Sequence, residues 1–177
     1  VAGVNAPTAI TLAGDNEAIA RIVERLEREG VFCKQLRVNV PFHSPVMEEI
    51  RAEWQEKLSD LGPREASVPL YAAATGVRAK GPELDAHYWW LNVRNPVYFQ
   101  DCFDLALEDG CTVFLEIGPH PVLVTSMQDC AASRGRSVNL FHSLYRNKSE
   151  LTVVGCTLAG LYSVGIEPDF ARLHPHG

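Results

Sequence analysis

Apolar and polar residues follow one another along the chain with a period that changes from two to nearly four. Such a change is typical of a mixed α/β protein, in which strands and helices alternate. Residues 1–4 and 9–13 are short runs joined by the turn sequence NAPT, and they predict a β-hairpin. Asp15 is placed as the N-cap of a helix that ends at Gly30. The apolar stripe of this helix consists of Ala18, Ile19, Ile22, Val23 and Leu26.

The middle of the chain predicts two strands and two helices. Residues 31–39 alternate loosely and indicate a strand, and residues 68–76 indicate a strand followed by a turn. Asn95 and Pro96 fit the N-cap and first position of a helix that ends at Gly110. An earlier helix of about four turns is predicted by residues recurring at every fourth position. These are Val46, Ile50, Trp54 and Leu58.

The aromatic segment 83–96 is expected to be irregular or to form a short helix. Residues 111–118 predict a buried strand of the kind found in parallel sheets, and a helix follows within residues 119–133. Residues 134–150 form the expected boundary between the globular part and a helical tail. The last helix ends near Gly165, and its apolar face consists of Leu151, Val154, Leu158, Leu161 and Tyr162.

Composition narrows the classes of function. The 177 residues are 46% hydrophobic and 21% charged, with a net charge of −6 and no basic stripe, so nucleic acid is not an expected partner. Five cysteines without a C-x-x-C pair indicate reduced thiols and a cytoplasmic location. No run approaches the ~20 apolar residues that span a bilayer, and no His/Cys/carboxylate cluster suggests a metal site. The start lacks Met and a signal pattern, which indicates a piece of a longer chain.

The stretch NVPFHSPVMEEI places a histidine, His43, between a predicted strand and a predicted helix. Ser44 and Pro45 fit the N-cap and first position of that helix, whose positive dipole end disfavours a charged imidazole. A neutral ring is what a general base requires. From the residues alone, the alternative is a solvated loop histidine in front of a capped helix.

Four motifs carry a resemblance to a known family: VNAPTAITLAGD, FHSPVMEEI, YWWLNVRNPVYF and FLEIGPHPVL. Their order and spacing are similar to the C-terminal half of the acyltransferase domain of type I modular polyketide synthases, over residues 1–170. The resemblance implies an α/β-hydrolase-like core with a ferredoxin-like insert. It assigns residues 1–38 to the latter part of the insert, 39–133 to part of the larger subdomain, and 134–177 to the linker after the acyltransferase.

The resemblance also implies a chemistry. In such domains a serine–histidine dyad passes a malonyl-type group from coenzyme A, through a serine ester, to the phosphopantetheine thiol of an acyl carrier protein. His43 matches the base, and the backbone carbonyl of Asn92 matches the group that orients its ring. The domain is expected to bind no cofactor of its own. Further expected partners are the ketosynthase and linker domains of the same synthase.

The nucleophilic serine of the family lies in a G-H-S-x-G motif, and no G-x-S-x-G occurs in the 177 residues. The resemblance therefore places the serine upstream, in the N-terminal half of the domain. Two alternatives stay open. The chain could be a non-catalytic scaffold or docking half-domain of a synthase, or it could belong to a serine hydrolase or thioesterase. A hydrolase would need an acidic residue to orient His43.

Phe42 and Val40 bear on the substrate. In the family, a phenylalanine directly before the base goes with malonyl units and a serine with methylmalonyl units. Rejection of one methyl group is worth only about 1–3 kcal/mol, so a bias is expected rather than an absolute choice. Val40 stands where many relatives have a polar residue, which leaves an unusual acyl unit open. His120 is expected to be structural. A solvated helix face is expected for Glu48, Glu49, Arg51, Glu53 and Glu56.

Overall fold

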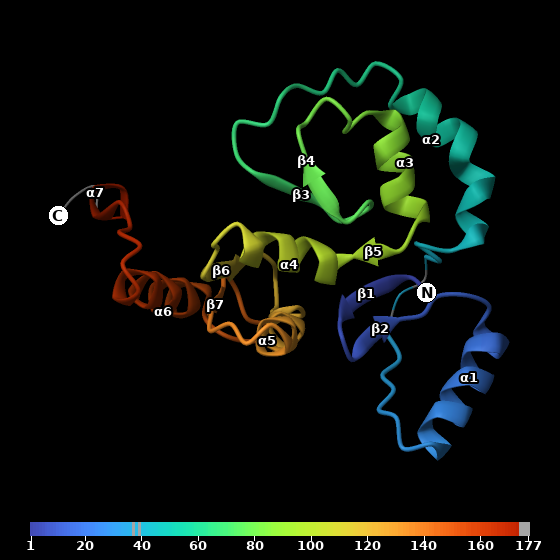
Figure 1. Ribbon diagram of the computed structural model, residues 1–177, viewed down its shortest axis with the longest axis horizontal. Helices are drawn as coiled ribbons and strands as arrows, with labels where there is room; N and C mark the ends of the chain where they lie inside the picture. Colours follow the sequence, from blue (N-terminus) through green and yellow to red (C-terminus); the bar gives the residue numbers. More distant parts are fainter. Residues whose placement is uncertain (37, 39, 174–177) are drawn as a thin grey trace. The chain divides into compact units, whose positions relative to one another are not determined.

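The computed structural model describes residues 1–36, 38 and 40–173, and its chain forms two compact units, Val1–Ala106 and Leu107–Gly177 (Figure 1). The first unit contains β1 (Gly3–Ala6), β2 (Ala9–Thr11), α1 (Asn16–Arg28), the 3₁₀ helix η1 (Pro45–Ile50), α2 (Arg51–Lys57), β3 (Leu70–Ala72), β4 (Val77–Ala79), α3 (Ala86–Arg94) and β5 (Val97–Tyr98). Helix α4 (Phe99–Glu108) leads into the second unit, which continues with β6 (Val113–Glu116), α5 (Val124–Ser133), β7 (Asn139–His142), α6 (Glu150–Ser163) and α7 (Phe170–Leu173). The mixed α/β class is confirmed.

The predicted hairpin is confirmed. Strands β1 and β2 are antiparallel, with Val4 opposite Ile10, and β5 adds to the other side of β1 in parallel. The three strands therefore have the order β2-β1-β5. This small sheet joins the start of the chain to the segment after α3, because the N–H of Val97 donates to the carbonyl of Ala2 at 2.9 Å.

Helix α1 begins and ends as predicted. The Asp15 carboxylate accepts the N–H of Ala18 at 3.0 Å, which is an N-cap hydrogen bond. Gly30 follows the helix with φ +77°, a left-handed conformation that suits glycine. No residue of α1 is buried, and Ile22 on its apolar face is 42% exposed. The helix therefore depends on local signals rather than on packing within this chain.

The strand predicted over residues 31–39 is wrong for the residues that the structure describes. Residues 31–36 and 38 form no strand, and their apolar side chains stand out, with Phe32 86% exposed and Val38 70% exposed. An extended segment becomes a strand only when a neighbour bonds its N–H and C=O groups. The described strands pair with one another and not with this segment. Arg37 and Asn39 lie outside the described residues.

Helices α2 and α3 lie side by side (Figure 1), and an apolar cluster joins η1, α2 and α3. Met47, Trp90 and Val93 form its centre, and Trp54 and Leu91 pack against them. The predicted four-turn helix is confirmed in position, but its first part is the 3₁₀ helix η1. The aromatic segment forms α3, as the short-helix alternative predicted, and the Asp85 carboxylate caps it by accepting the N–H of Tyr88.

The helix start predicted at Asn95 and Pro96 is wrong. Asn95 is instead the extended C-cap of α3, with ψ 163°, and the next helix begins at Phe99. A residue before proline is biased toward extended backbone, and the free edge of β1 pairs with Val97. Strand β4, which pairs with the predicted strand β3, was also not predicted from the sequence.

The second unit is built on a parallel pair, β6 and β7, with Val113 opposite Asn139. The predicted strand is therefore parallel, although it is only half-buried. The predictions placed no strand at β7, which lies in the segment expected to be a boundary. Helix α6 packs closely on β7, because a Cβ added at Gly160 would come within 2.5 Å of the Phe141 ring. The predicted division of the chain into an insert, a larger subdomain and a linker, with boundaries after residues 38 and 133, stays a prediction.

Among the described residues, no helix combines the length and the apolar character needed to cross a bilayer. The cytoplasmic location stays a prediction.

Candidate active site

His43 stands at a sharp corner between the segment after α1 and helix η1. Its backbone has φ +60°, a left-handed conformation that is uncommon outside glycine. The backbone N–H of His43 donates to the carbonyl of Val93 at 2.8 Å, so the last turn of α3 holds the corner. A strained backbone persists only where surrounding contacts maintain it, and such positions cluster at functional sites.

The ring of His43 is oriented by a second carbonyl from the same place. Its Nδ1 lies 2.7 Å from the backbone oxygen of Asn95. A carbonyl oxygen can only accept a hydrogen bond, so the proton of the neutral ring is assigned to Nδ1. The lone pair is then on Nε2, which can accept a proton from a substrate or a nucleophile. The carbonyl thus fixes the tautomer of the ring, as a carboxylate does in a catalytic triad.

The residue predicted to orient the ring, Asn92, is not the one that contacts Nδ1. Asn92 lies inside α3, where backbone carbonyls point along the helix axis. The chain leaves the helix at Asn95, whose extended ψ turns its carbonyl toward His43. Both asparagines belong to the motif N-x-x-N. The carbonyl that contacts Nδ1 belongs to the second of them, Asn95, and not to the first, Asn92. The expected group, a backbone carbonyl, is the one observed.

Ser44 occupies the N-cap position of η1, but its side chain makes no cap hydrogen bond. The hydroxyl instead donates to the carbonyl of Pro41 at 2.7 Å, and Ser44 is only 1% exposed. A buried hydroxyl tied to a backbone oxygen is poorly placed to attack a substrate. Ser44 therefore serves the turn that presents His43 and is not a candidate nucleophile.

Phe42 and Val40, the predicted substrate-contacting residues, are both exposed near the corner, at 46% and 47%. The Phe42 ring centroid lies 6.3 Å from that of His43, and the two planes are tilted by 49°. An apolar ring therefore flanks the imidazole at the surface of the first unit. Substrate contact by Phe42 and Val40 stays a prediction.

One element of the corner was missed by the sequence reasoning. Glu48 and Arg51 are exposed, as expected for a solvated face. The Glu48 carboxylate also accepts a hydrogen bond from Nε of Arg94 at 2.7 Å, which was not predicted. Glu48 also lies 3.6 Å from the Arg51 guanidinium. Arg94 is 46 residues away from Glu48 along the chain. No local pattern connects residues so far apart.

His120, which the sequence analysis also considered, is not held as His43 is. His120 accepts the N–H of Arg146 at Nδ1 and packs edge-on against Tyr145, as a structural residue would. His174 and His176 lie outside the described residues. Among the described residues, no group of three or more His, Cys, Asp and Glu side chains is arranged to hold a metal ion.

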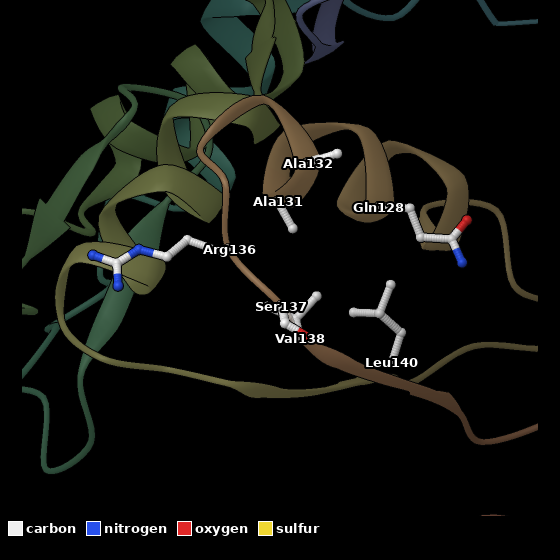
Figure 2. A pocket seen from close by; sticks show the side chains of 7 residues that line it. All are labelled: Gln128, Ala131, Ala132, Arg136, Ser137, Val138 and Leu140. Carbon is white, nitrogen blue, oxygen red and sulfur yellow. The ribbon is translucent and has the colours of Figure 1, made fainter.

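The described residues of the second unit border two hollows that are relevant here. One, of about 340 Å³, lies between α5 and the segment that leads into β7. Figure 2 shows Ala131 and Leu140 pointing into it, while the Arg136 side chain extends away. The other, of about 430 Å³, is bordered by β7 and α6 and is mostly apolar. Neither is lined by His43.

Among the described residues, Cys102, Tyr88 and Glu83 have pKa values shifted from their ordinary ranges. Burial raises the pKa of the Cys102 thiol to about 11, and the Asp101 carboxylate adds to the shift. Burial raises the pKa of Tyr88, partly offset by a hydrogen bond with the Ala74 backbone. Backbone hydrogen bonds lower the pKa of Glu83. Cys102 and Tyr88 are thus neutral near pH 7. The role of His43 as a base stays a prediction.

Comparison with known proteins agrees with this geometry. The family model of the acyl transferase domain matches residues 1–167. Polyketide synthase GfsB of Streptomyces halstedii is 35% identical over 176 residues, which cover 99% of this chain and 3% of that protein. The chain therefore spans a small part of this relative.

Solved structures match over nearly the whole chain. The acyltransferase domain from module 8 of the salinomycin polyketide synthase is 33% identical with a TM-score of 0.91, covering 96% of this chain and 40% of that one. The acyltransferase domain of SpnD, in complex with 2-(pent-4-yn-1-yl)malonyl, is 28% identical with a TM-score of 0.84, covering 93% and 41%. The match of sequence and fold shows that this chain belongs to the acyl transferase domain family.

Proposed function

We propose that this chain provides the base of an acyltransferase that works in polyketide synthesis. The acyl group is of the malonyl type, its donor is a coenzyme A thioester, and its acceptor is the phosphopantetheine thiol of an acyl carrier protein. The supporting observation is the 2.7 Å hydrogen bond between His43 Nδ1 and the Asn95 carbonyl, because it leaves Nε2 free to accept a proton. The protein needs no cofactor of its own for these steps.

The reaction has two balanced halves. Nε2 takes the proton of a serine hydroxyl while the serine oxygen bonds to the thioester carbon, and the imidazolium returns that proton to the departing coenzyme A sulfur. The phosphopantetheine thiol then gives its proton to Nε2, its sulfur attacks the serine ester, and the serine oxygen takes the proton back. Throughout, the Asn95 carbonyl keeps the ring in one tautomer and stabilises its charged form.

The serine is proposed to come from polypeptide outside this chain, in the N-terminal half of the same domain. The chain has no G-x-S-x-G, Ser44 is buried in its own turn, and the chain spans 40% of the salinomycin acyltransferase structure. The ketosynthase, the linker domains and the carrier protein of the same synthase are the other proposed partners. A serine hydrolase is less favoured, because the observed partner of Nδ1 is a carbonyl and not a carboxylate.

The deciding experiment is acyl-enzyme formation from radiolabelled malonyl-CoA by the complete protein that contains this chain. His43→Ala is expected to lower the rate about 1,000-fold, within the range for loss of a general base. The matched control is His87→Ala, because His87 is exposed on the same α3 helix and takes no part in the corner. Normal acylation by His43→Ala would remove His43 from the mechanism and support the scaffold alternative.

The acyl preference is proposed to depend on Phe42, whose ring flanks the imidazole, with Val40 nearby in the chain. The SpnD structure holds a malonyl group with a side chain, so the family accommodates branched units. Phe42→Ser is expected to raise loading from methylmalonyl-CoA relative to malonyl-CoA by about 10- to 100-fold, the scale of one methyl group. An unchanged ratio would reject the steric explanation while leaving the role of His43 intact.

A further inference from the structure

A network of charged side chains joins the corner of His43 to the end of α3. Arg94 Nε donates to Glu48 Oε1 at 2.7 Å, and the other oxygen of Glu48 lies 3.6 Å from Arg51. The Arg51 guanidinium in turn lies over the Trp90 ring, 5.6 Å from its centroid. Arg94 is the least exposed charged member, with 27% of its side chain accessible. The network therefore crosses from η1 and α2 to α3 and back.

Arg94 occupies a special place in the sequence. It stands between Val93, whose carbonyl accepts the N–H of His43, and Asn95, whose carbonyl holds the ring. Glu48, its partner, lies five residues after His43 in η1. The ion pair thus connects Arg94, which lies between the two carbonyls, to η1, the helix that starts two residues after His43.

Apolar packing alone would fix this arrangement less well. Met47, Trp90 and Val93 hold η1 against α3, but apolar contacts are non-directional and tolerate small sliding movements. A short, charge-assisted hydrogen bond has a preferred direction and length. The left-handed backbone of His43 also has to be held from both sides, because it would relax if either attachment moved.

We infer that Arg94 and Glu48 are positioning residues for the base: their ion pair keeps the two backbone carbonyls at the end of α3 aligned with His43. The inference deepens the proposed function and rests on it. Neither side chain touches a reacting atom in this account. The pair acts through the orientation of the imidazole, so its loss reduces the rate of proton transfer and not the affinity for the acyl donor.

The test compares four variants of the complete protein: Glu48→Gln, Arg94→Gln, the double variant, and Glu53→Gln as a matched control. Glu53 pairs with Lys57 at 3.3 Å on the same helical segment, and both side chains are largely exposed. Three quantities are measured: kcat and KM for acyl-enzyme formation, the NMR resonance of the His43 Nδ1 proton, and the melting temperature.

Each single variant is expected to lower kcat about 10- to 100-fold, the scale of a small misplacement of a catalytic group, with KM within about twofold. The double variant should be no slower than the slower single variant, because the two residues act as one unit. The Nδ1 proton should exchange faster or lose its signal. Glu53→Gln should resemble the parent protein in all three measurements.

The inference is overturned if kcat in both single variants stays within about twofold of the control. It is also overturned if kcat falls while the Nδ1 resonance is unchanged, or falls only in proportion to the unfolded fraction. These results differ from failure of the proposed function, in which His43→Ala itself keeps normal acylation. The NMR readout reports the ring directly and does not depend on which acyl group the protein transfers.

Discussion

Helix α1 and the His43 corner belong to the same unit, yet they are stabilised in opposite ways. Helix α1 has a side-chain N-cap, a glycine after its end and three i,i+4 ion pairs, but none of its residues is buried. The corner includes buried Ser44 and Met47, and residues about 50 positions away in α3 provide its hydrogen bonds. Local signals hold the first region, and long-range contacts hold the second.

The difference shows which kind of structure can carry a reactive group. A helix held by local signals is defined only as well as neighbouring residues define it, and its exposed ion pairs are worth little. The corner is fixed by groups that approach from another element, so its geometry is maintained against backbone strain. Substitutions should therefore be much more costly in the corner than in α1.

The largest expected effect is at the core beneath the corner. Trp90 is 2% exposed, and Trp90→Ala should lower the free energy of unfolding by about 3–5 kcal/mol, as for other buried aromatic residues. Ile22→Ala on the half-open face of α1 should cost about 1 kcal/mol. Urea unfolding of the complete protein gives both values. If Ile22→Ala costs as much as Trp90→Ala, α1 is packed in the complete protein and the contrast is confined to this chain.

The second effect compares two hydrogen bonds made by side chains to the backbone. Ser44→Ala deprives the Pro41 carbonyl of its hydroxyl donor in a buried turn, at an expected cost of about 1–3 kcal/mol. Asp15→Ala removes the exposed N-cap of α1, at a cost of about 1 kcal/mol. The midpoints of denaturant unfolding measure both. A smaller cost for Ser44→Ala than for Asp15→Ala would contradict the importance assigned to the turn.

The third effect is the difference in stability between a glycine variant and an alanine variant, which should have opposite signs in the two regions. At His43, with φ +60°, the glycine variant should be more stable than the alanine variant by about 1 kcal/mol, because glycine tolerates left-handed backbone. At Ala20, an exposed position within α1, glycine should be less stable than alanine by about 1 kcal/mol. Thermal unfolding of the four proteins checks the prediction. The same sign at both positions would show that the corner relaxes when the ring is removed.

The last effect is a dependence of stability on pH, which is absent near neutral pH and appears only in alkaline solution. The folded Cys102 thiol has a pKa of about 11, whereas an unfolded thiol titrates near about 8.5. Between these values the unfolded chain loses its proton first, so stability should fall as the pH rises through this window. Cys102→Ser should make the decline smaller, leaving the part due to Tyr88, whose pKa is also raised by burial, and Cys33→Ser, in the segment after α1, should keep the full decline. Urea midpoints from pH 8 to 11 test the expectation, and an equal decline in both variants would count against it.

Much of the fold could be predicted where one segment contains its own signals. The bounds of α1 follow from Asp15 and Gly30, and the hairpin follows from its turn sequence. The strand at residues 31–39 failed because a strand needs a neighbour that no local pattern provides. The helix start at Asn95 failed for a related reason, since pairing with β1 takes Val97 into a strand.

The site was predictable in type but not in detail. His43 was identified from its place between apolar runs and from the motifs around it. The choice between Asn92 and Asn95 depended on where α3 ends, and helix ends are poorly defined by spacing alone. The pair of Glu48 and Arg94 had no signal at all in the sequence, because charges on an amphipathic segment look alike until a partner approaches.

The amino-acid sequence by itself determined the mixed α/β class, the choice of His43 as the candidate base, the family resemblance and the absence of a nucleophile motif in these residues. These depend on residue types at short spacing, which local chemistry makes visible. Only the tertiary structure decided which carbonyl holds the imidazole, why Ser44 is buried and what anchors the end of α3. Each of these is a contact between groups about 50 residues apart or a change of backbone direction, and the free energy of such contacts depends on distances that only the folded chain creates.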